Sequence, residues 1–300
     1  MRTAEEVTWE GTLAQPKDRH IPSLPKFRIR ATDVLLFGAL LVVLFFVLCA
    51  LFPGLLAPYS PTELMLDSVM APPSAEHLFG TDHFGRDILS IVIYGSRVSI
   101  LTGVVAVLLG GLTGGLLGAL AGYVGGWLDA VVMRLIDILM TIPGILLALL
   151  IVAVLKPSFY NIVLAISIST IPSYARVMRS EALRIKELPF ILASRSIGTS
   201  HVVIFLRHIV PNAVSSFLVI ATIGLGSAIL MAAGLSFLGL GVMDEIPDWG
   251  TLLSQGRGYL STAWWICTFP GLFVTVYVLA INVIGDHLRD LLSPKLKQEG

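Results

Sequence analysis

Six long apolar stretches constrain the fold of this chain more than any other feature of its sequence. A helix that crosses the hydrocarbon core of a membrane needs about 20 mostly apolar residues. Soluble domains carry about 25% charged residues, whereas only 13% of these 300 residues are charged. We therefore predict an all-α polytopic membrane protein with six transmembrane helices, at 34–52, 98–122, 135–155, 161–175, 213–241 and 266–285.

The distribution of lysine and arginine orients these helices, because cytoplasmic loops of membrane proteins are enriched in both residues. With the N-terminus in the cytoplasm, all 20 of them lie inside except Arg86, Arg97, Lys156 and Arg257. We therefore expect both termini to be cytoplasmic. The predicted parts are an N-terminal tail (1–33), a transmembrane domain (34–288) with an outer loop (53–97) and a long inner loop (176–212), and a C-terminal tail (289–300).

The second apolar stretch carries a glycine at every fourth position, at Gly110, Gly114, Gly118 and Gly122. Residues four apart lie on one face of a helix. Small residues there let two helix backbones approach closely in a membrane. We interpret the row as a packing seam, and a glycine-lined gap for a transported molecule is the alternative.

Motifs for catalysis or nucleotide binding are missing. A phosphate-binding loop requires a lysine directly after a glycine, and no lysine of this chain follows a glycine. The histidines are scattered without metal-ligand spacing, so we expect no catalytic, cofactor or metal site in this chain. A membrane-embedded enzyme therefore has no support from the sequence.

Charged residues inside the predicted spans are scarce. Only Asp137 comes close to the middle of a span, and Arg134 can pair with it one helical turn away. We prefer that structural pairing to a proton relay. A stand-alone secondary transporter or channel is the alternative function, but a carrier driven by an ion gradient usually places ionisable groups within the membrane. The energy for transport is therefore expected to come from another chain.

The inner loop contains the polar segment "ILASRSIGTSHVVIFLRHIVPNA" (191–213). Pro189 suits the first turn of a helix, Gly198 suits its end, and Pro211 can break the following helix at the membrane surface. The helix is expected to present one apolar face, made by Phe190, Ala193 and Ile197 at helical spacing. We predict a short amphipathic helix over 187–200, and a helix lying in the lipid headgroups is the alternative.

This segment resembles the coupling loop of permease subunits of ATP-binding-cassette (ABC) importers. The family pattern is E-A-A, three residues, glycine, nine residues and I-x-L-P. Gly198 and Pro211 stand at the family's glycine and proline positions, whereas Leu192 replaces the glutamate and His208 the isoleucine. We therefore expect this loop to engage its partner through shape and apolar contact rather than through that carboxylate.

Further segments resemble the dipeptide/oligopeptide/nickel subgroup of these importers, and most of all its C-type permease. They include "LFGTDHFGRDILS", "GYVGGWLDAVVMRLIDILMTIPG", "LSFLGLG", "PDWGTLL" and "NVIGDHLRDLLSPK". The resemblance implies the type I importer permease fold and a non-catalytic, multi-pass subunit of a bacterial plasma membrane. Peptides are the favoured substrate class, and nickel, glutathione-like peptides and glycosides stay open.

The resemblance also implies the partners, which are the lipid bilayer, a homologous B-type permease, two cytoplasmic ATPases that bind the ATP, and an extracytoplasmic solute-binding protein, with no nucleic acid. Segments 53–97 and 241–265 would lie near the binding protein. The residues expected at the ATPase are Phe190, Leu192, Ala193, Arg195, Ile197 and Gly198, of which Arg195 is expected to fix the loop by a salt bridge or similar contact. Pro211 and Asn212 are expected to hold the loop in place.

Overall fold

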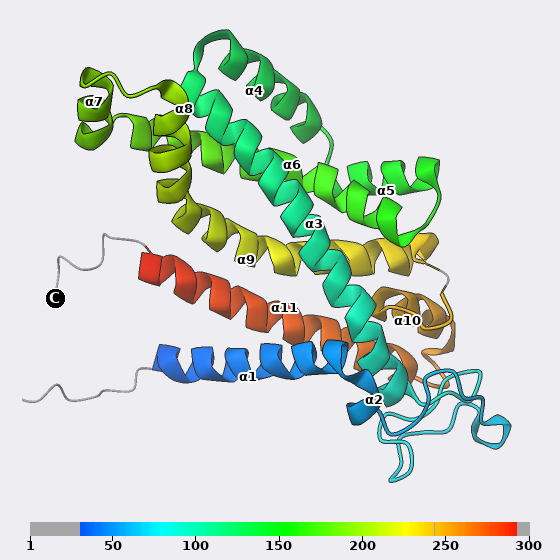
Figure 1. Ribbon diagram of the computed structural model, residues 1–300. Helices are drawn as coiled ribbons and strands as arrows, with labels where there is room; N and C mark the ends of the chain where they lie inside the picture. The colour runs from blue at the N-terminus through cyan, green and yellow to red at the C-terminus, as the bar shows by residue number, and fades with distance from the viewer. Residues whose placement is uncertain (1–30, 243, 293–300) are drawn as a thin grey trace, which may run out of the picture.

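The computed structural model describes residues 31–242 and 244–292, and within these ranges the chain is helical, with one isolated β-bridge and no strand. Of the tails predicted at 1–33 and 289–300, only residues 31–33 and 289–292 are described, and these belong to helices. Five helices are long and apolar enough to cross a membrane, and their bounds are α1 (Ala31–Leu51), α3 (Ile88–Val124), α6 (Phe159–Lys186), α9 (Val210–Leu235) and α11 (Trp265–Leu292) (Figure 1). These helices lie where the sequence predicts five of its six spans.

The remaining predicted span, 135–155, is broken rather than straight. Its two halves, α4 (Gly126–Met140) and α5 (Gly144–Leu155), meet at an angle of 84°. Pro143 stands at the break with extended backbone, at ψ 131°. Proline has no N–H to donate into the preceding turn, and it disfavours helical backbone in the residue before it. The chain therefore has six spans only if this bent pair counts as one.

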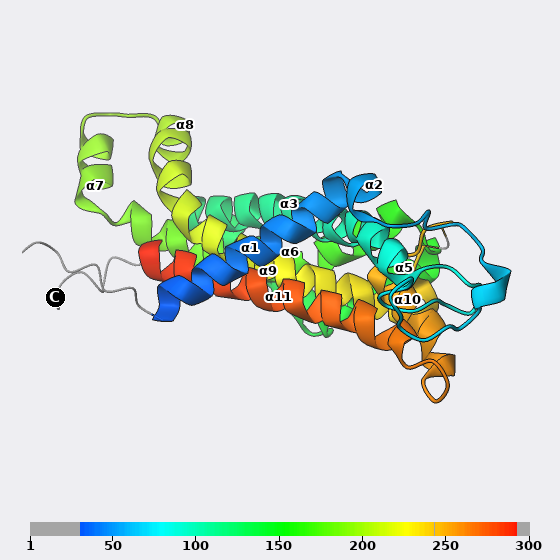
Figure 2. The same ribbon diagram turned by 90° about the horizontal axis from the view of Figure 1, so that it is seen from below.

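The molecule is elongated, and its shorter elements gather at its two ends (Figure 2). One end holds α7 (Pro189–Ser196) and α8 (His201–Ile204), together with the start of α1 and the end of α11. We call this the α7 end. The opposite end, the α10 end, contains α2 (Pro53–Leu56), η1 (Leu66–Ser68), α10 (Trp249–Gly256) and η4 (Arg257–Tyr259). Both limits of the described chain thus lie at the α7 end.

The glycine row of α3 is a packing seam, as predicted. A methyl group on any of its members would lie within 2.6 Å of a backbone carbonyl oxygen of α6, and the oxygens belong to Ser167, Ile171, Ala175 and Arg179. Successive glycines, four residues apart on α3, contact residues that are four apart on α6. The backbones can come this close only where side chains are missing. The seam makes α3 and α6 the rigid centre of the fold.

Two predicted boundaries move because helices extend beyond the apolar stretches. Helix α3 begins at Ile88, ten residues before the predicted span, since the Asp87 carboxylate accepts a hydrogen bond from Ser90 N at 2.8 Å and caps the first turn. Helix α6 continues to Lys186, so residues 176–186 belong to a helix and not to the inner loop. Hydropathy marks the part of a helix that is apolar, not where the helix ends.

The ion pairs also differ from the prediction. Asp137 pairs with Arg176 of α6 at 2.9 Å rather than with its helical neighbour Arg134. Further along the same interface, Arg179 Nη2 lies 2.6 Å from Asp129 Oδ2. Both pairs join α4 to α6, which a spacing argument within one helix could not reveal. They hold α4 against α6 at the side of the bundle.

The predicted outer loop is a folded cap with a buried polar cluster. His77, Thr81, Asp82, Arg86 and Asp87 are all buried. The Arg86 Nε donates to Asp82 Oδ2 at 2.8 Å, and the Trp265 indole N–H donates to Thr81 O at 3.0 Å. A charge buried in this way requires a partner, and the pairing supplies it. The cap is therefore a fixed part of the α10 end rather than a solvated loop.

Asp248 joins α10 to the end of α9. Its carboxylate accepts from Thr251 N and from Ser236 Oγ, each at 2.9 Å, so that it caps α10 and holds the π-helical turn η3 (Ser236–Leu240). Burial raises the pKa of the Asp248 carboxyl above its usual range. The folded state therefore binds the proton more tightly than the unfolded state, and ionisation of this carboxyl at neutral pH opposes folding.

We expect Asp248→Ala to lower the free energy of unfolding by about 1–2 kcal/mol, because it removes a helix cap. Asp248→Asn keeps an acceptor for Thr251 N and cannot ionise, so at pH 7 it should be at least as stable as the wild type. Unfolding of the detergent-solubilised protein measures both. As the pH falls towards 4, this contribution should make the wild type more stable but leave Asp248→Asn unchanged. Equal losses in both variants would show that the carboxylate charge itself is needed.

Candidate functional site

The loop between α6 and α9 forms a short helix with well-defined ends. Leu188 has extended backbone, Pro189 occupies the first turn of α7, and the helix ends at Ser196. Gly198 follows with φ +82°. A residue with a side chain rarely adopts this left-handed conformation, whereas glycine does so without strain. The start at Pro189 and the turn at Gly198 agree with the prediction of a helix over 187–200.

Helix α7 has a buried side and an exposed side. Ile191 is fully buried in an apolar cluster that includes Ile185 of α6 and Ile204 of α8. The side chains predicted to meet a partner point elsewhere: Phe190 and Leu192 are each 45% exposed, Ile197 is 82% exposed, and Ala193 is exposed as well. The sequence missed Ile191 as the anchor, although its apolar character inside a polar loop was a usable signal.

Arg195 lies over an aromatic ring. Its guanidinium carbon lies 5.6 Å from the ring centre of Tyr123, near the end of α3. The Tyr123 hydroxyl in turn lies 3.1 Å from Nδ1 of His201, which begins α8. A cation over an aromatic face is attracted by the ring's quadrupole, which is negative at the face. The short helix is thereby tied to the glycine-packed centre of the bundle.

Pro211 does not break the helix, contrary to the prediction. The chain runs from α8 through the π-helical turn η2 (Phe205–Ile209) into α9. Val210 N donates to Phe205 O, five residues back, just before the proline. The wider turn accommodates a residue that cannot donate. Asn212 Nδ2 donates to His208 O at 2.7 Å, one turn earlier in the same helical run. The loop therefore continues into α9 as one stiff helical rod.

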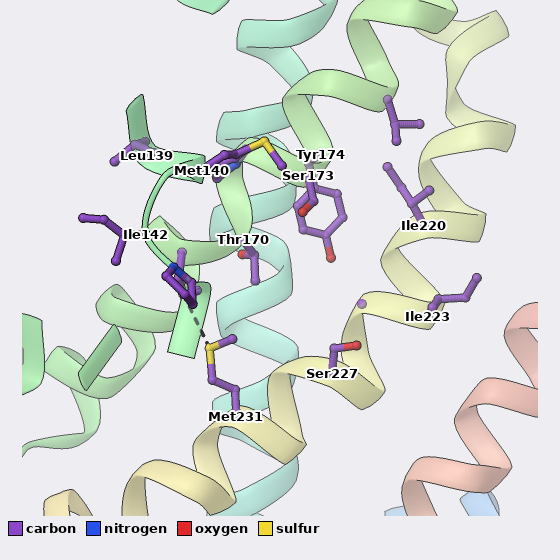
Figure 3. A pocket seen from close by; sticks show the side chains of 16 residues that line it. Leu139, Met140, Ile142, Thr170, Ser173, Tyr174, Ile220, Ile223, Ser227 and Met231 are labelled. Atoms are coloured by element: carbon purple, nitrogen blue, oxygen red, sulfur yellow. Dashed lines mark hydrogen bonds between the residues drawn. The ribbon is translucent and has the colours of Figure 1, made fainter. Parts of the chain in front are cut away.

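A cavity of about 480 Å³ lies between the bend of the broken span, α6 and α9 (Figure 3). None of the described residues that line it is charged. The hydroxyl-bearing side chains among them are Ser169, Thr170, Ser173, Tyr174 and Ser227. Met231 contributes its thioether, and the Ser169 hydroxyl lies 3.5 Å from that sulfur. The cavity therefore offers hydrogen bonds in an otherwise apolar wall.

The Tyr174 hydroxyl is exceptional among these groups. The side chain is 3% exposed, and its oxygen has no hydrogen-bond partner among the described residues. Opposite it stands Gly224 of α9, where a methyl group would overlap the tyrosine oxygen. Sequence reasoning missed this cavity. The signal was present as hydroxyl residues at helical spacing along 169–174, but only the bent third span shows that they face open space.

In the described part of the chain, no group of three or more histidine, cysteine, aspartate or glutamate side chains gathers to hold a metal ion. The two places just described are an exposed apolar surface on α7 and a hydrogen-bonding cavity between helices.

Comparison with known proteins shows which family this chain resembles. A family model described as binding-protein-dependent transport system inner membrane component matches residues 114–298. The chain is 40% identical over 294 residues to the dipeptide transport system permease protein of Alkalihalophilus pseudofirmus, with 97% of each chain covered. It is 44% identical over 271 residues to a glutathione transport system permease protein of Escherichia coli, covering 90% of this chain and 89% of the relative.

A solved structure agrees at the level of the fold. A chain of the MetNI methionine ABC transporter in inward-facing conformations superposes with a TM-score of 0.55 at 18% identity, covering 69% of this chain and 96% of the other. The predicted importer permease fold is thereby confirmed. The chain belongs to the family of binding-protein-dependent transport system inner membrane components, and it is a non-catalytic, multi-pass permease subunit of an ABC importer.

Proposed function

We propose that this chain forms half of the translocation path of an ATP-driven importer of short peptides, together with a homologous permease of the B type. Relatives of nearly full length are named for dipeptide, di/tripeptide and glutathione transport, which supports a peptide substrate. In this arrangement two ATPases bind at the α7 end, in the cytoplasm. A solute-binding protein docks at the α10 end, on the cap and on residues 241–265.

The observation that carries the proposal is the construction of α7. An apolar surface of this helix is open to solvent, and Ile197 is 82% exposed. Its opposite side is clamped by Ile191 to the ends of α6 and α8. Because α8 continues through η2 into α9, a push on α7 reaches a spanning helix as a rigid-body movement. This connection from α7 to α9 can transmit a movement only if a partner chain binds α7 and moves it.

Reconstitution of the complex tests the proposal against a stand-alone carrier or channel. The permease should co-purify with its ATPases and a second permease. In proteoliposomes that contain ATP, uptake of a labelled dipeptide presented by the binding protein should stop when ATP hydrolysis is blocked. Uptake by this chain alone, with a gradient and without ATPases, would overturn the proposal.

Substitution of Gly198 tests the turn that ends α7. Gly198→Val places a branched side chain at φ +82°, which costs about 1–2 kcal/mol of backbone strain and should shift α7 relative to α8. We expect uptake per ATP hydrolysed to fall severalfold while the membrane fold is retained, because a Cβ at this position meets nothing within 4 Å.

Gly198→Asn is the matched control, since asparagine tolerates left-handed backbone better than other residues with side chains. It should keep most of the coupling. Uptake and ATPase rates measured side by side on the reconstituted complexes separate the two variants. Normal coupling in Gly198→Val would contradict the proposal that α7 transmits movement from the ATPases to α9.

A further inference from the structure

We propose that the cavity between the bent span, α6 and α9 is a binding site for the transported peptide, in which the Tyr174 hydroxyl donates a hydrogen bond to a main-chain carbonyl oxygen. This inference rests on the proposed function as a peptide importer and names the group that the path recognises. Four features support it: the uncharged lining of the cavity, the unpaired Tyr174 hydroxyl, Gly224 opposite that hydroxyl, and the position of the tyrosine between helices.

The wall of the cavity selects a class of ligand group. Its described residues contribute hydroxyls and a thioether but no charged side chain. A charged group that leaves water without a counter-charge is strongly disfavoured, whereas an amide needs only a hydrogen bond. This side of the path is therefore suited to neutral peptide groups rather than to charged termini. Amide carbonyls occur in every peptide, so the site would accept peptides of different side chains.

Among the described residues, the Tyr174 hydroxyl is the buried donor left unused in this wall, whereas Ser173 and Ser227, whose hydroxyls also make no hydrogen bond, are exposed. Ser169 donates to Ala165 O at 2.9 Å and Thr170 to Ser167 O at 3.0 Å, so both satisfy their donors within α6. The tyrosine hydroxyl has no partner although its side chain is buried. Buried hydroxyls in folded proteins nearly always have one. An isolated donor at the edge of a cavity indicates that its partner arrives with a ligand.

Gly224 creates the place for this hydroxyl. The backbone of α9 lies directly opposite the tyrosine oxygen, and any side chain there would occupy its position. Figure 3 shows the ring of Tyr174 extending from α6 towards α9 above Ser227. The pairing of tyrosine with glycine lets the hydroxyl reach the boundary between the two helices, where it is covered in this conformation and would meet a ligand in the cavity once α9 moves away.

The ring is also placed where the helices would move. Tyr174 packs against Gly111 and Gly114 of α3 and lies 6.2 Å from the ring of Phe217 on α9. A tilt of α9 away from α6 would uncover the hydroxyl without disturbing the α3–α6 seam. Because α9 continues the helical run that begins with α8, a movement of α7 and a ligand in the binding site would act on the same helix.

The test uses the complete importer with its second permease and ATPases, and dialanine as the probe. Tyr174→Phe removes one hydrogen bond, so the KM for uptake should rise about five- to tenfold. The variant should unfold at the same temperature as the wild type or higher, because it also removes an unpaired buried hydroxyl. Tyr160→Phe makes the same chemical change at an 80% exposed side chain and should change nothing.

A binding measurement separates this inference from the proposed function. Dialanine should raise the unfolding temperature of the complex without binding protein or ATP, since a ligand that binds only the folded state stabilises it. The increase should be smaller in Tyr174→Phe and unchanged in Tyr160→Phe. Equal stabilisation of the wild type and Tyr174→Phe, or none in either, would overturn the inference. Absence of ATP-driven uptake from every complex, wild type included, would contradict the proposed function instead.

Discussion

Replacing Gly118 with leucine is expected to prevent this permease from folding stably in the membrane. A side chain at this position would meet the backbone of Ala175 at the tightest point of the α3–α6 seam. Overpacking of a core costs about 1–3 kcal/mol where side chains can adjust. Here the obstacle is the main chain of the neighbouring helix, so the two helices must separate. We expect a loss above that range, seen as low membrane yield and a lower unfolding temperature.

The matched control is Gly38→Leu. Gly38 also lies inside a predicted spanning helix, α1, but a Cβ there would meet nothing within 4 Å. Both substitutions replace a helical glycine with the same good helix former, so any gain in helix propensity is shared. A Gly118→Leu protein as abundant and as stable as Gly38→Leu would show that the seam is not tight.

Replacing Ile197 with aspartate is expected to abolish ATP-driven uptake while the permease itself stays folded. The side chain is 82% exposed, so the bundle does not depend on it. In the complex it would be buried against an ATPase, where an unpaired carboxylate is strongly disfavoured. We expect uptake to fall at least about tenfold, since each factor of ten corresponds to only about 1.4 kcal/mol, and less ATPase to co-purify.

Two further variants define the cause of that loss. Ile197→Val keeps an apolar side chain and should transport like the wild type. Ile191→Asp acts on the buried face of the same helix and should also destabilise the permease in the absence of ATPases. If Ile197→Asp retains both uptake and bound ATPase, the exposed face of α7 is not the contact surface, and the coupling role falls with it.

Much of this architecture could be predicted from single stretches of sequence. The apolar stretches located the spanning helices because the length of a membrane helix is set by the bilayer. The four-residue glycine row predicted a helix seam, since only small residues allow that approach. Pro189 and Gly198 bounded α7 because each has a local backbone preference that no distant residue needs to supply. These features depend on neighbours along the chain.

Other features depend on residues that are close only in space. Asp137 pairs with Arg176 rather than with Arg134 because α4 folds back along α6. Pro211 leaves its helix intact because a π-helical turn absorbs the missing hydrogen bond. The cap at the α10 end can bury Asp82 and Arg86 because the Arg86 guanidinium donates a hydrogen bond to the Asp82 carboxylate. Its sequence alone is as polar as that of a solvated loop.

The sequence by itself determined that this chain crosses the membrane as a bundle of helices and that a short helix lies between Pro189 and Gly198, because hydropathy, glycine spacing and backbone preference act locally. Only the tertiary structure decided that the third span bends, that Ile191 anchors α7, and that the unpaired Tyr174 hydroxyl stands opposite Gly224 beside a cavity. The physical reason is that a bend, an anchor and a cavity are each defined by surfaces from different helices, and those surfaces meet only when the bundle packs.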